Sequence, residues 1–285
     1  MTEVNYLESL NPLQYESVCS TEGPNLIIAG AGTGKTKVLT TRVAHIIDNN
    51  LAFPSQILCV TFTNKAAREM SERVQKLVSQ NMEKMPWMGT FHSIGAKIIR
   101  NHAEVIGLKQ SFTILDKDDQ LSLIKQIIKA ENLDQSQFSP KLIQSKIDHW
   151  KNKALNPNDI KSESLDNLVD EKSLSIYKIY QARLFEINCL DFGDLLLQCI
   201  NLFKVPDIHK RYSNNFKYIH VDEYQDTNAA QYKWLKLLGS HHQNVCCVGD
   251  DDQSIYSWRG AEVDNMLRFE NCLLYTSDAA DDSLG

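Results

Sequence analysis

The sequence predicts an α/β protein in which a mostly parallel sheet, covered by helices, is interrupted by a helical insertion. Short apolar runs at residues 26–28, 57–62, 218–221 and 245–248 each end in a polar or glycine-rich turn. Helical periodicity follows most of these runs, and such alternation of strands and helices favours a parallel sheet. Between residues 92 and 216, helical periodicity continues with almost no strand signal.

The first apolar run leads directly into the segment Ala29-Gly30-Ala31-Gly32-Thr33-Gly34-Lys35-Thr36, and a helical pattern follows at residues 37–47. This order of strand, glycine-rich loop, Gly-Lys-Thr and helix predicts a phosphate-binding loop. Its backbone N–H groups would surround phosphate oxygens, Lys35 would reach the β- and γ-phosphates, and Thr36 would hold Mg²⁺. The alternative is an ordinary surface turn. Such a turn would not need a strand before it, or Gly-Lys-Thr and a helix after it. The sequence therefore predicts a nucleotide-binding protein.

The helical insertion is predicted from apolar residues at helical spacing. Residues 118–130 carry Leu121, Ile124, Ile127 and Ile128, and residues 173–187 have a similar period. We expect the α/β domain to consist of residues 1–91 and 217–271, with residues 92–216 as the inserted helical subdomain. The first and last portions must then meet in space to complete one sheet.

Two further segments carry the chemistry that phosphoanhydride hydrolysis needs. Asp222 and Glu223 follow the strand predicted at residues 218–221, where Asp222 could bind the metal and Glu223 could polarise a water. A solvated acidic strand end is the alternative. Residues 249–260 then bring Gln253, a candidate γ-phosphate sensor, and the cluster of Tyr256, Trp258 and Arg259, which could stack on bases. For two of the three acids at 250–252 we expect turn or capping roles, because neighbours on a strand face opposite ways.

Composition limits the possible functions. The formal net charge of −6 argues against coating duplex DNA by bulk electrostatics, but it permits a local groove for a single strand. The seven cysteines include no C-x-x-C pair, so we expect reduced thiols rather than zinc ligands or disulfides. The N-terminus is polar and no apolar run approaches the roughly 20 residues of a membrane span. We therefore expect a soluble, cytoplasmic protein with no membrane partner.

In combination, these residues resemble the N-terminal half of UvrD/Rep-type superfamily 1 DNA helicases, from about residue 10 to residue 271. The matching segments are residues 10–14 (the glutamine motif), 29–36 (Walker A), 61–67 (motif Ia), 89–93 (the adjoining DNA-contacting segment), 221–228 (Walker B) and 249–260 (motif III). The resemblance implies a RecA-like P-loop NTPase domain with an inserted helical subdomain. It also implies 3′→5′ translocation on single-stranded DNA, driven by ATP with Mg²⁺, and action on 3′-tailed duplex DNA.

The resemblance further implies roles for individual residues. Gln14 would read adenine and Arg42 would lie beside the base. Lys35 and Thr36 would take phosphate and metal, Asp222 would hold Mg²⁺, Glu223 would be the catalytic base, and Gln253 would link the γ-phosphate to DNA. The DNA path would be lined by Phe62, Asn64, His92, Tyr256, Trp258 and Arg259. Residues 190–196 also resemble a family signature, for which a packing role is sufficient.

Residues 272–285 no longer resemble the family and are similar to the translated end of a sequencing adapter, so we interpret them as a non-native tail on a truncated sequence. Members of the family continue into a second RecA-like domain, which supplies further arginines to the nucleotide. We therefore expect this chain to bind ATP weakly, to hydrolyse it very slowly and not to unwind DNA.

Alternative interpretations are the motor portion of a helicase-nuclease, a non-catalytic ATP-dependent DNA-binding switch, and a small-molecule kinase. Intact Lys35, Asp222 and Glu223 count against the switch.

Overall fold

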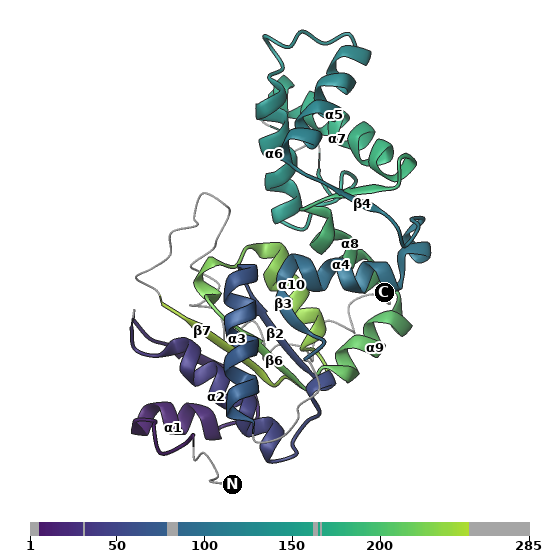
Figure 1. Ribbon diagram of the computed structural model, residues 1–285. Helices are drawn as coiled ribbons and strands as arrows, with labels where there is room; N and C mark the ends of the chain where they lie inside the picture. Colours follow the sequence, from purple (N-terminus) through teal and green to yellow (C-terminus); the bar gives the residue numbers. More distant parts are fainter. Residues whose placement is uncertain (1–5, 31, 79–84, 162–164, 166, 251–285) are drawn as a thin grey trace, which may run out of the picture. The chain divides into compact units, whose positions relative to one another are not determined.

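The computed structural model describes residues 6–30, 32–78, 85–161, 165 and 167–250, and its contacts divide the chain into two compact units (Figure 1). We call Met1–Ile94, Pro206–Thr227 and Leu235–Gly285 the sheet unit, and Gly95–Val205 with Asn228–Trp234 the helical unit. The expected insertion at residues 92–216 overlaps the helical unit and extends beyond it at both ends. Among the described residues, the structure contains no helix with the length and apolar character needed to cross a membrane.

The sheet unit is built on a five-stranded parallel sheet with the strand order β1-β7-β6-β2-β3. The strands are β1 (Asn25–Ile28), β2 (Ile57–Thr61), β3 (Met88–Thr90), β6 (Tyr218–Val221) and β7 (Val245–Gly249). Because β7 and β6 lie between β1 and β2, the first and last portions of the chain form one sheet. The predicted α/β class is confirmed. Strand β3 was not predicted, since three residues are too few to show an alternating pattern.

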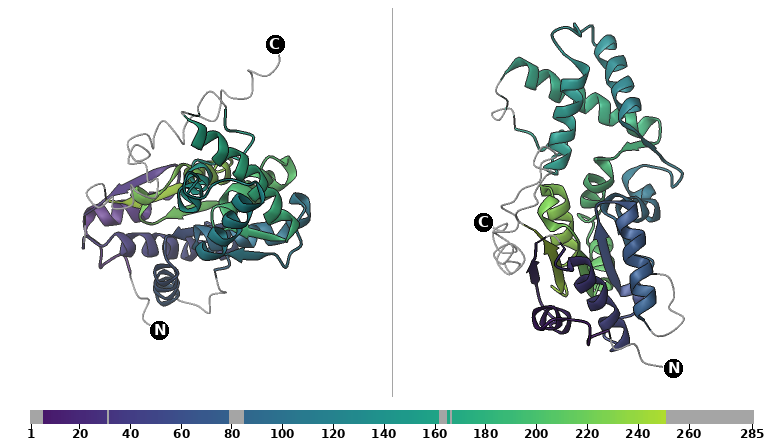
Figure 2. Two further views of the ribbon diagram at one scale, coloured as in Figure 1. Left: turned by 90° about the horizontal axis from the view of Figure 1, so that it is seen from above. Right: turned by 60° about the vertical axis from the view of Figure 1, so that its left-hand side comes forward.

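Helices α2 and α3 cover one face of this sheet (Figures 1 and 2). Leu39 and Val43 of α2 and Met70 of α3 pack against Ile57, Cys59 and Cys246 of the strands, and all six are fully buried. The helical elements that lie in or enter this unit are α1 (Pro12–Cys19), α2 (Lys35–Asp48), η1 (Pro54–Gln56), α3 (Asn64–Leu77), α4 (Phe91–Asn101), α9 (Pro206–Asn215), η4 (Tyr224–Asp226) and α10 (Ala229–Leu238). This packing holds the loop between β1 and α2 at the carboxyl edge of the sheet.

The helical unit consists mainly of η2 (Ala103–Ile106), α5 (Lys117–Ala130), α6 (Pro140–Asn152), α7 (Leu168–Glu186) and α8 (Asp194–Leu202). Its core joins α5, α6 and α7 through buried Ile124, Ile128, Ile143, Ile147 and Tyr177. The expectation of an all-helical subdomain is wrong in one respect. Strands β4 (Thr113–Leu115) and β5 (Cys189–Asp191) pair in parallel, and they were missed because each has only three residues.

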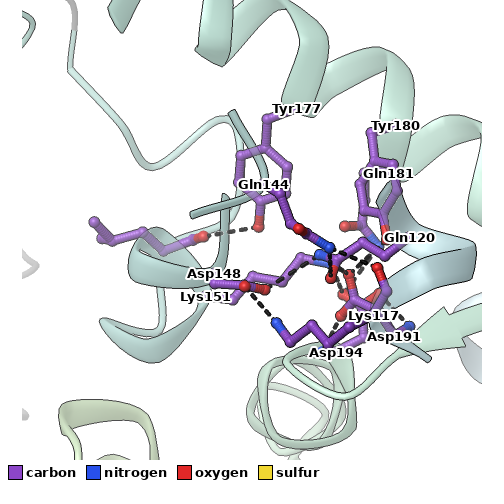
Figure 3. Close-up of polar contacts among 11 residues, drawn as sticks. Lys117, Gln120, Gln144, Asp148, Lys151, Tyr177, Tyr180, Gln181, Asp191 and Asp194 are labelled. Carbon is purple, nitrogen blue, oxygen red and sulfur yellow. Dashed lines mark hydrogen bonds and ion pairs between the residues drawn. The ribbon is translucent and has the colours of Figure 1, made fainter. Parts of the chain in front are cut away.

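A buried charge network links the elements of the helical unit (Figure 3). The Lys151 side chain is fully buried, and its Nζ lies 2.7 Å from Asp191 Oδ2 and 2.8 Å from Asp194 Oδ1. Tyr180 donates to Asp191, and Gln181 donates to Asp194. Burial, reinforced by the Asp191 charge, raises the pKa of Asp194 to about 6. Residues 190–196, which resemble a family signature, thus contribute the two carboxylates, at the end of β5 and the start of α8, that bind side chains of α6 and α7.

Candidate nucleotide-binding site

The loop between β1 and α2 has the conformation that its glycines permit. Gly32 and Gly34 have φ angles of +73° and +93°, in the left-handed region that disfavours other residues. Thr33 closes the loop through a 2.7 Å hydrogen bond from its Oγ1 to the Gly30 carbonyl. Helix α2 begins at Lys35, so its N-terminal backbone N–H groups face the loop. This is a general anion-binding arrangement. Ala31 lies outside the described residues.

Lys35 lies among carboxylates that come from two neighbouring strands. Its Nζ is 3.2 Å from Asp250 Oδ2 and 3.9 Å from Glu223 Oε2. Asp250 directly follows β7, which pairs with β1, and Glu223 comes two residues after the end of β6, which pairs with β7. The sheet order therefore brings the three residues to one edge. An ammonium placed among anionic oxygens is also placed to pair with phosphate oxygens.

Asp222 continues β6 by donating its backbone N–H to the Val60 carbonyl at 3.0 Å, and the residue is only 4% exposed. Burial, together with the charge of Glu223, raises the pKa of this carboxyl to about 6. A raised pKa means that the ionised carboxylate is destabilised here, so a nearby cation would stabilise it. Thr36, in the first turn of α2, adds a hydroxyl.

These oxygen donors are of the type that Mg²⁺ prefers, and Mg²⁺ is often held by one or two carboxylates completed by phosphate oxygens. The part of the chain that the structure describes contains no group of three or more His, Cys, Asp or Glu side chains arranged to hold a metal. Asp222 and Thr36 supply oxygen donors of this type, and their predicted binding of Mg²⁺ stays a prediction.

Glu223 has a left-handed backbone with a φ angle of +52°, which is unusual for a residue with a side chain. Its carboxylate accepts a 2.7 Å hydrogen bond from Gln225 Nε2, and Gln225 Oε1 accepts one of 3.1 Å from the backbone N–H of Asp250. Gln225 therefore connects the two acidic positions around Lys35. Strain of this kind is often found at functional sites.

The sequence interpretation missed both Gln225 and Asp250. Asp250 was counted among three consecutive acids for which mainly turn or capping roles were expected. The missed signal is its position: it is the first residue after β7, at the carboxyl end of a strand that lies next to β1. In open parallel sheets this edge is where ligands bind.

Gln14 connects helix α1 to the loop between β1 and α2, and Arg42 connects α1 to helix α2. Gln14 Nε2 donates to the Thr33 carbonyl at 2.9 Å, while its Oε1 accepts from the Asn11 backbone in a capping box. Arg42 is only 1% exposed, and its guanidinium donates to the carbonyls of Ser17 and Thr21. The structure thus shows Arg42 anchoring α1, and its predicted place beside a base stays a prediction.

Three of the residues predicted to line a DNA path lie at the carboxyl ends of β2 and β3. Phe62 follows β2 and contacts Phe91, which follows β3, with ring centroids 5.5 Å apart and planes at 60°. His92 is the second residue of α4, and Asn64 begins α3 on the exposed surface. Parallel pairing of β2 with β3 brings them to one edge. Gln253, Tyr256, Trp258 and Arg259 lie outside the described residues.

The chain is similar to proteins named as DNA helicases. The chain is 51% identical over 274 residues to a protein of Rickettsia typhi named DNA helicase II, a match covering 95% of this chain and 41% of that protein. It is 49% identical over 265 residues to the ATP-dependent DNA helicase PcrA of Staphylococcus aureus, covering 93% of this chain and 36% of that protein. The chain thus spans well under half the length of these relatives. Residues 10–273 match the UvrD/REP helicase N-terminal domain, and the chain therefore belongs to that family.

Proposed function

We propose that this chain is the ATP-binding portion of an ATP-dependent DNA helicase that translocates 3′→5′ on single-stranded DNA. The observation that carries the proposal is the position of Lys35, at the start of α2, within 3.9 Å of Glu223 and 3.2 Å of Asp250 at one edge of a parallel sheet. A phosphate loop whose lysine lies near acids that follow two neighbouring strands has the parts that hydrolysis of a triphosphate requires. The names of the similar proteins, which include two DNA helicases, favour DNA as the partner.

Each residue of the site would have a defined part in hydrolysis. Lys35 and the backbone N–H groups at the start of α2 would bind the β- and γ-phosphates, and Thr36 with Asp222 would hold Mg²⁺. The metal, when bound, neutralises charge on the phosphate oxygens. Glu223 would orient and polarise the attacking water, with Gln225 holding its carboxylate in place. Gln253 would link the γ-phosphate to the DNA-binding surface.

Adenine recognition is assigned to Gln14. A glutamine amide can pair with both the N6 amino group and the N7 atom of adenine, because it offers an acceptor and a donor side by side. Gln14 is already fixed at the nucleotide loop through Thr33, so a base bound near this loop would meet its amide. Guanine presents an acceptor at O6 where adenine presents a donor, and the same amide would match it less well.

The DNA partner is assigned to the edge formed by β2 and β3. Phe62, which packs on the fully buried Phe91, is partly exposed and offers a ring face on which a base of a single strand could stack, and Asn64 and His92 at the same edge offer polar groups. Tyr256, Trp258 and Arg259 would extend this surface. The proposed substrates are single-stranded DNA and duplex DNA with a 3′ tail.

The nucleotide part of the proposal is tested by Glu223→Gln in the 285-residue chain. Single-turnover hydrolysis of labelled ATP, with enzyme in excess, detects even very slow reaction. We expect Glu223→Gln to lower the rate by at least about 100-fold while ATP affinity stays within about threefold of wild type. Glu69→Gln, at an exposed position on α3, is the matched control and should hydrolyse ATP at the wild-type rate. An unchanged rate in Glu223→Gln would favour a binding switch that does not hydrolyse ATP.

The DNA part is tested by binding of a fluorescent oligothymidylate. Phe62→Ala should weaken binding about tenfold, because loss of one stacking side chain removes about 1–3 kcal/mol. Phe53→Ala is the control, since Phe53 is 73% exposed and lies away from this edge. Polarity is decided in the complete protein by comparing unwinding of 3′-tailed and 5′-tailed duplexes. Preference for the 5′ tail would contradict the proposed direction.

A further inference from the structure

Helix α1, which carries Gln14, has little apolar anchoring. Val18 is its one fully buried residue, whereas Leu13 and Tyr15 are 75% and 49% exposed. Burial of apolar surface normally fixes a surface helix, and here that contribution is small. The position of α1 must therefore depend on polar contacts at its two ends. At its start these include Lys37 Nζ on the Ser9 carbonyl at 2.6 Å and Gln14 Nε2 on the Thr33 carbonyl.

At its other end, α1 leads into residues 20–23, which are fastened to the amino edge of the sheet. The Glu22 carboxylate accepts hydrogen bonds from Tyr218 Oη and from Asn244 Nδ2, the latter at 3.0 Å. Tyr218 is the first residue of β6, and Asn244 directly precedes β7. Both donors are buried, with exposures of 2% and 8%. Glu22 thus accepts hydrogen bonds from two buried side chains, one at the start of β6 and one directly before β7.

The Asn244 side chain makes three hydrogen bonds that join residues 22–23 to the amino edge of the sheet. Its Oδ1 accepts the backbone N–H of Gly23 at 2.8 Å, and its Nδ2 donates both to Glu22 and to the Lys217 carbonyl at 3.2 Å. From the side of α2, Arg42 donates to the Thr21 carbonyl at 3.0 Å. Three consecutive residues, Thr21 to Gly23, are therefore held by side chains of the same sheet unit.

We propose that Tyr218 and Asn244, acting through Glu22, are positioning residues. They would hold α1 in the position from which Gln14 selects adenine over guanine. The proposal rests on the proposed function, since it assumes that a nucleotide binds at this loop. Neither residue lies at the carboxyl edge where phosphate would bind. Their effect would reach the base because α1 runs from the amino edge, at residues 20–23, to the nucleotide loop, at Gln14.

This arrangement predicts a specific pattern of effects. Loosening residues 20–23 would leave Lys35 and the phosphate loop unchanged, because β1 and α2 have their own packing. The amide of Gln14 would then sample several positions, and the loss would fall on base discrimination more than on phosphate affinity. We expect the loss of selectivity to correspond to the net contribution of one typical hydrogen bond, about 0.5–1.5 kcal/mol, which is a change of about two- to tenfold.

The experiment measures displacement of a fluorescent ATP analogue from the 285-residue chain by ATP, GTP and inorganic triphosphate. The variants are Tyr218→Phe, which removes only the hydroxyl, and Glu22→Ala, which removes the acceptor. Glu22→Gln retains one acceptor oxygen and should restore part of the selectivity. Asn215→Ala, which removes a 3.0 Å bond to the Ser55 carbonyl elsewhere in the sheet unit, is the matched control.

We expect wild type and Asn215→Ala to prefer ATP over GTP equally, and Tyr218→Phe and Glu22→Ala to reduce that preference about two- to tenfold with unchanged triphosphate affinity. In a Gln14→Ala background, Glu22→Ala should have no further effect. Unchanged selectivity in Tyr218→Phe and Glu22→Ala, with selectivity lost in Gln14→Ala, would overturn this inference alone. If wild type bound none of the three competitors, the proposed function itself would fail.

Discussion

The ammonium of Lys35 lies 3.2 Å from the carboxylate of Asp250, although the two residues are 215 positions apart in the sequence. Both side chains are largely buried, with exposures of 10% and 3%. The contact exists because β7 inserts between β1 and β6, which places the residue after β7 beside the first residue of α2. Lys35 Nζ is thereby held at the carboxyl edge of the sheet, between acidic groups that follow β6 and β7.

Replacement of Lys35 by methionine should preserve its packing and remove its charge. We expect ATP affinity to fall at least about tenfold and single-turnover hydrolysis at least about 100-fold, because the lysine stabilises charge on the phosphates. Isothermal titration and the labelled ATP assay would measure the two effects. Lys65→Met, at a side chain that is 87% exposed, is the control and should match wild type. Wild-type hydrolysis by Lys35→Met would show that phosphate binds elsewhere.

Asp222→Asn should stabilise the protein at neutral pH while impairing metal binding. The pKa of Asp222 is raised from 3.8 to about 6, so the folded state holds this proton more tightly than the unfolded state does. Below about pH 4 the carboxyl is protonated in both states, and as the pH rises through about 6 the folded state loses that advantage. We therefore expect Asp222→Asn to gain about 1–3 kcal/mol in unfolding free energy at pH 8.

The check is urea denaturation of both proteins between pH 4 and pH 8 in the absence of magnesium. The gain should shrink toward zero as the pH falls. A gain that is independent of pH would mean that the substitution acts through packing rather than through ionisation. Addition of magnesium and ATP should stabilise wild type more than Asp222→Asn.

Substitutions at Glu223 should change the stability of the protein and its activity independently. Its φ angle of +52° costs a residue with a Cβ about 1–2 kcal/mol, and glycine escapes this cost. Glu223→Gly should therefore be about 1 kcal/mol more stable than Glu223→Ala, although both remove the carboxylate and should be equally inactive. Thermal unfolding of the two variants measures the difference. Equal stability would indicate that the backbone relaxes when the side chain is lost.

The network around Lys151 predicts an unequal cost for its members. Lys151→Met should destabilise the helical unit by about 3–5 kcal/mol, because it leaves two buried carboxylates without a cation. Asp191→Asn should cost more than Asp194→Asn at pH 8. Although burial opposes it, Lys151 lowers the pKa of Asp191, whereas burial raises that of Asp194 to about 6. Ionised Asp191 thus contributes stability at this pH, and ionised Asp194 costs it.

Chemical denaturation followed by circular dichroism would measure these costs. Lys117→Met is the control, because Lys117 is 61% exposed in its pair with Asp148 and such surface pairs contribute little. Equal costs for Asp191→Asn and Asp194→Asn would contradict the assigned charge states.

The parts of this fold that could be predicted from sequence are those with strong local signals. Strands β1, β2, β6 and β7 are continuous apolar runs that end in polar turns, and the phosphate loop has a fixed order of residues. The strands β3, β4 and β5 have three residues each and show no period. Their pairing depends on tertiary contacts, which a local pattern does not contain.

The candidate site shows the same division. Lys35, Asp222 and Glu223 were predicted because each stands beside a recognisable strand or loop. Asp250 and Gln225 were missed because their importance comes from strand order, which places β7 beside β1 and β6 beside β7. The position of Arg42 depends on the path of α1, whose carbonyls it binds, and that path could not be read from the spacing of residues.

The central claim is that Lys35, Asp222 and Glu223 form one triphosphate pocket. A crystal structure of this chain with Mg²⁺ and a non-hydrolysable ATP analogue tests it most directly. We predict phosphate oxygens at about 3 Å from Lys35 Nζ, with the metal beside Thr36 and Asp222 and the γ-phosphate facing Glu223. A nucleotide bound away from this loop, with Lys35 still paired to Asp250, would contradict the claim.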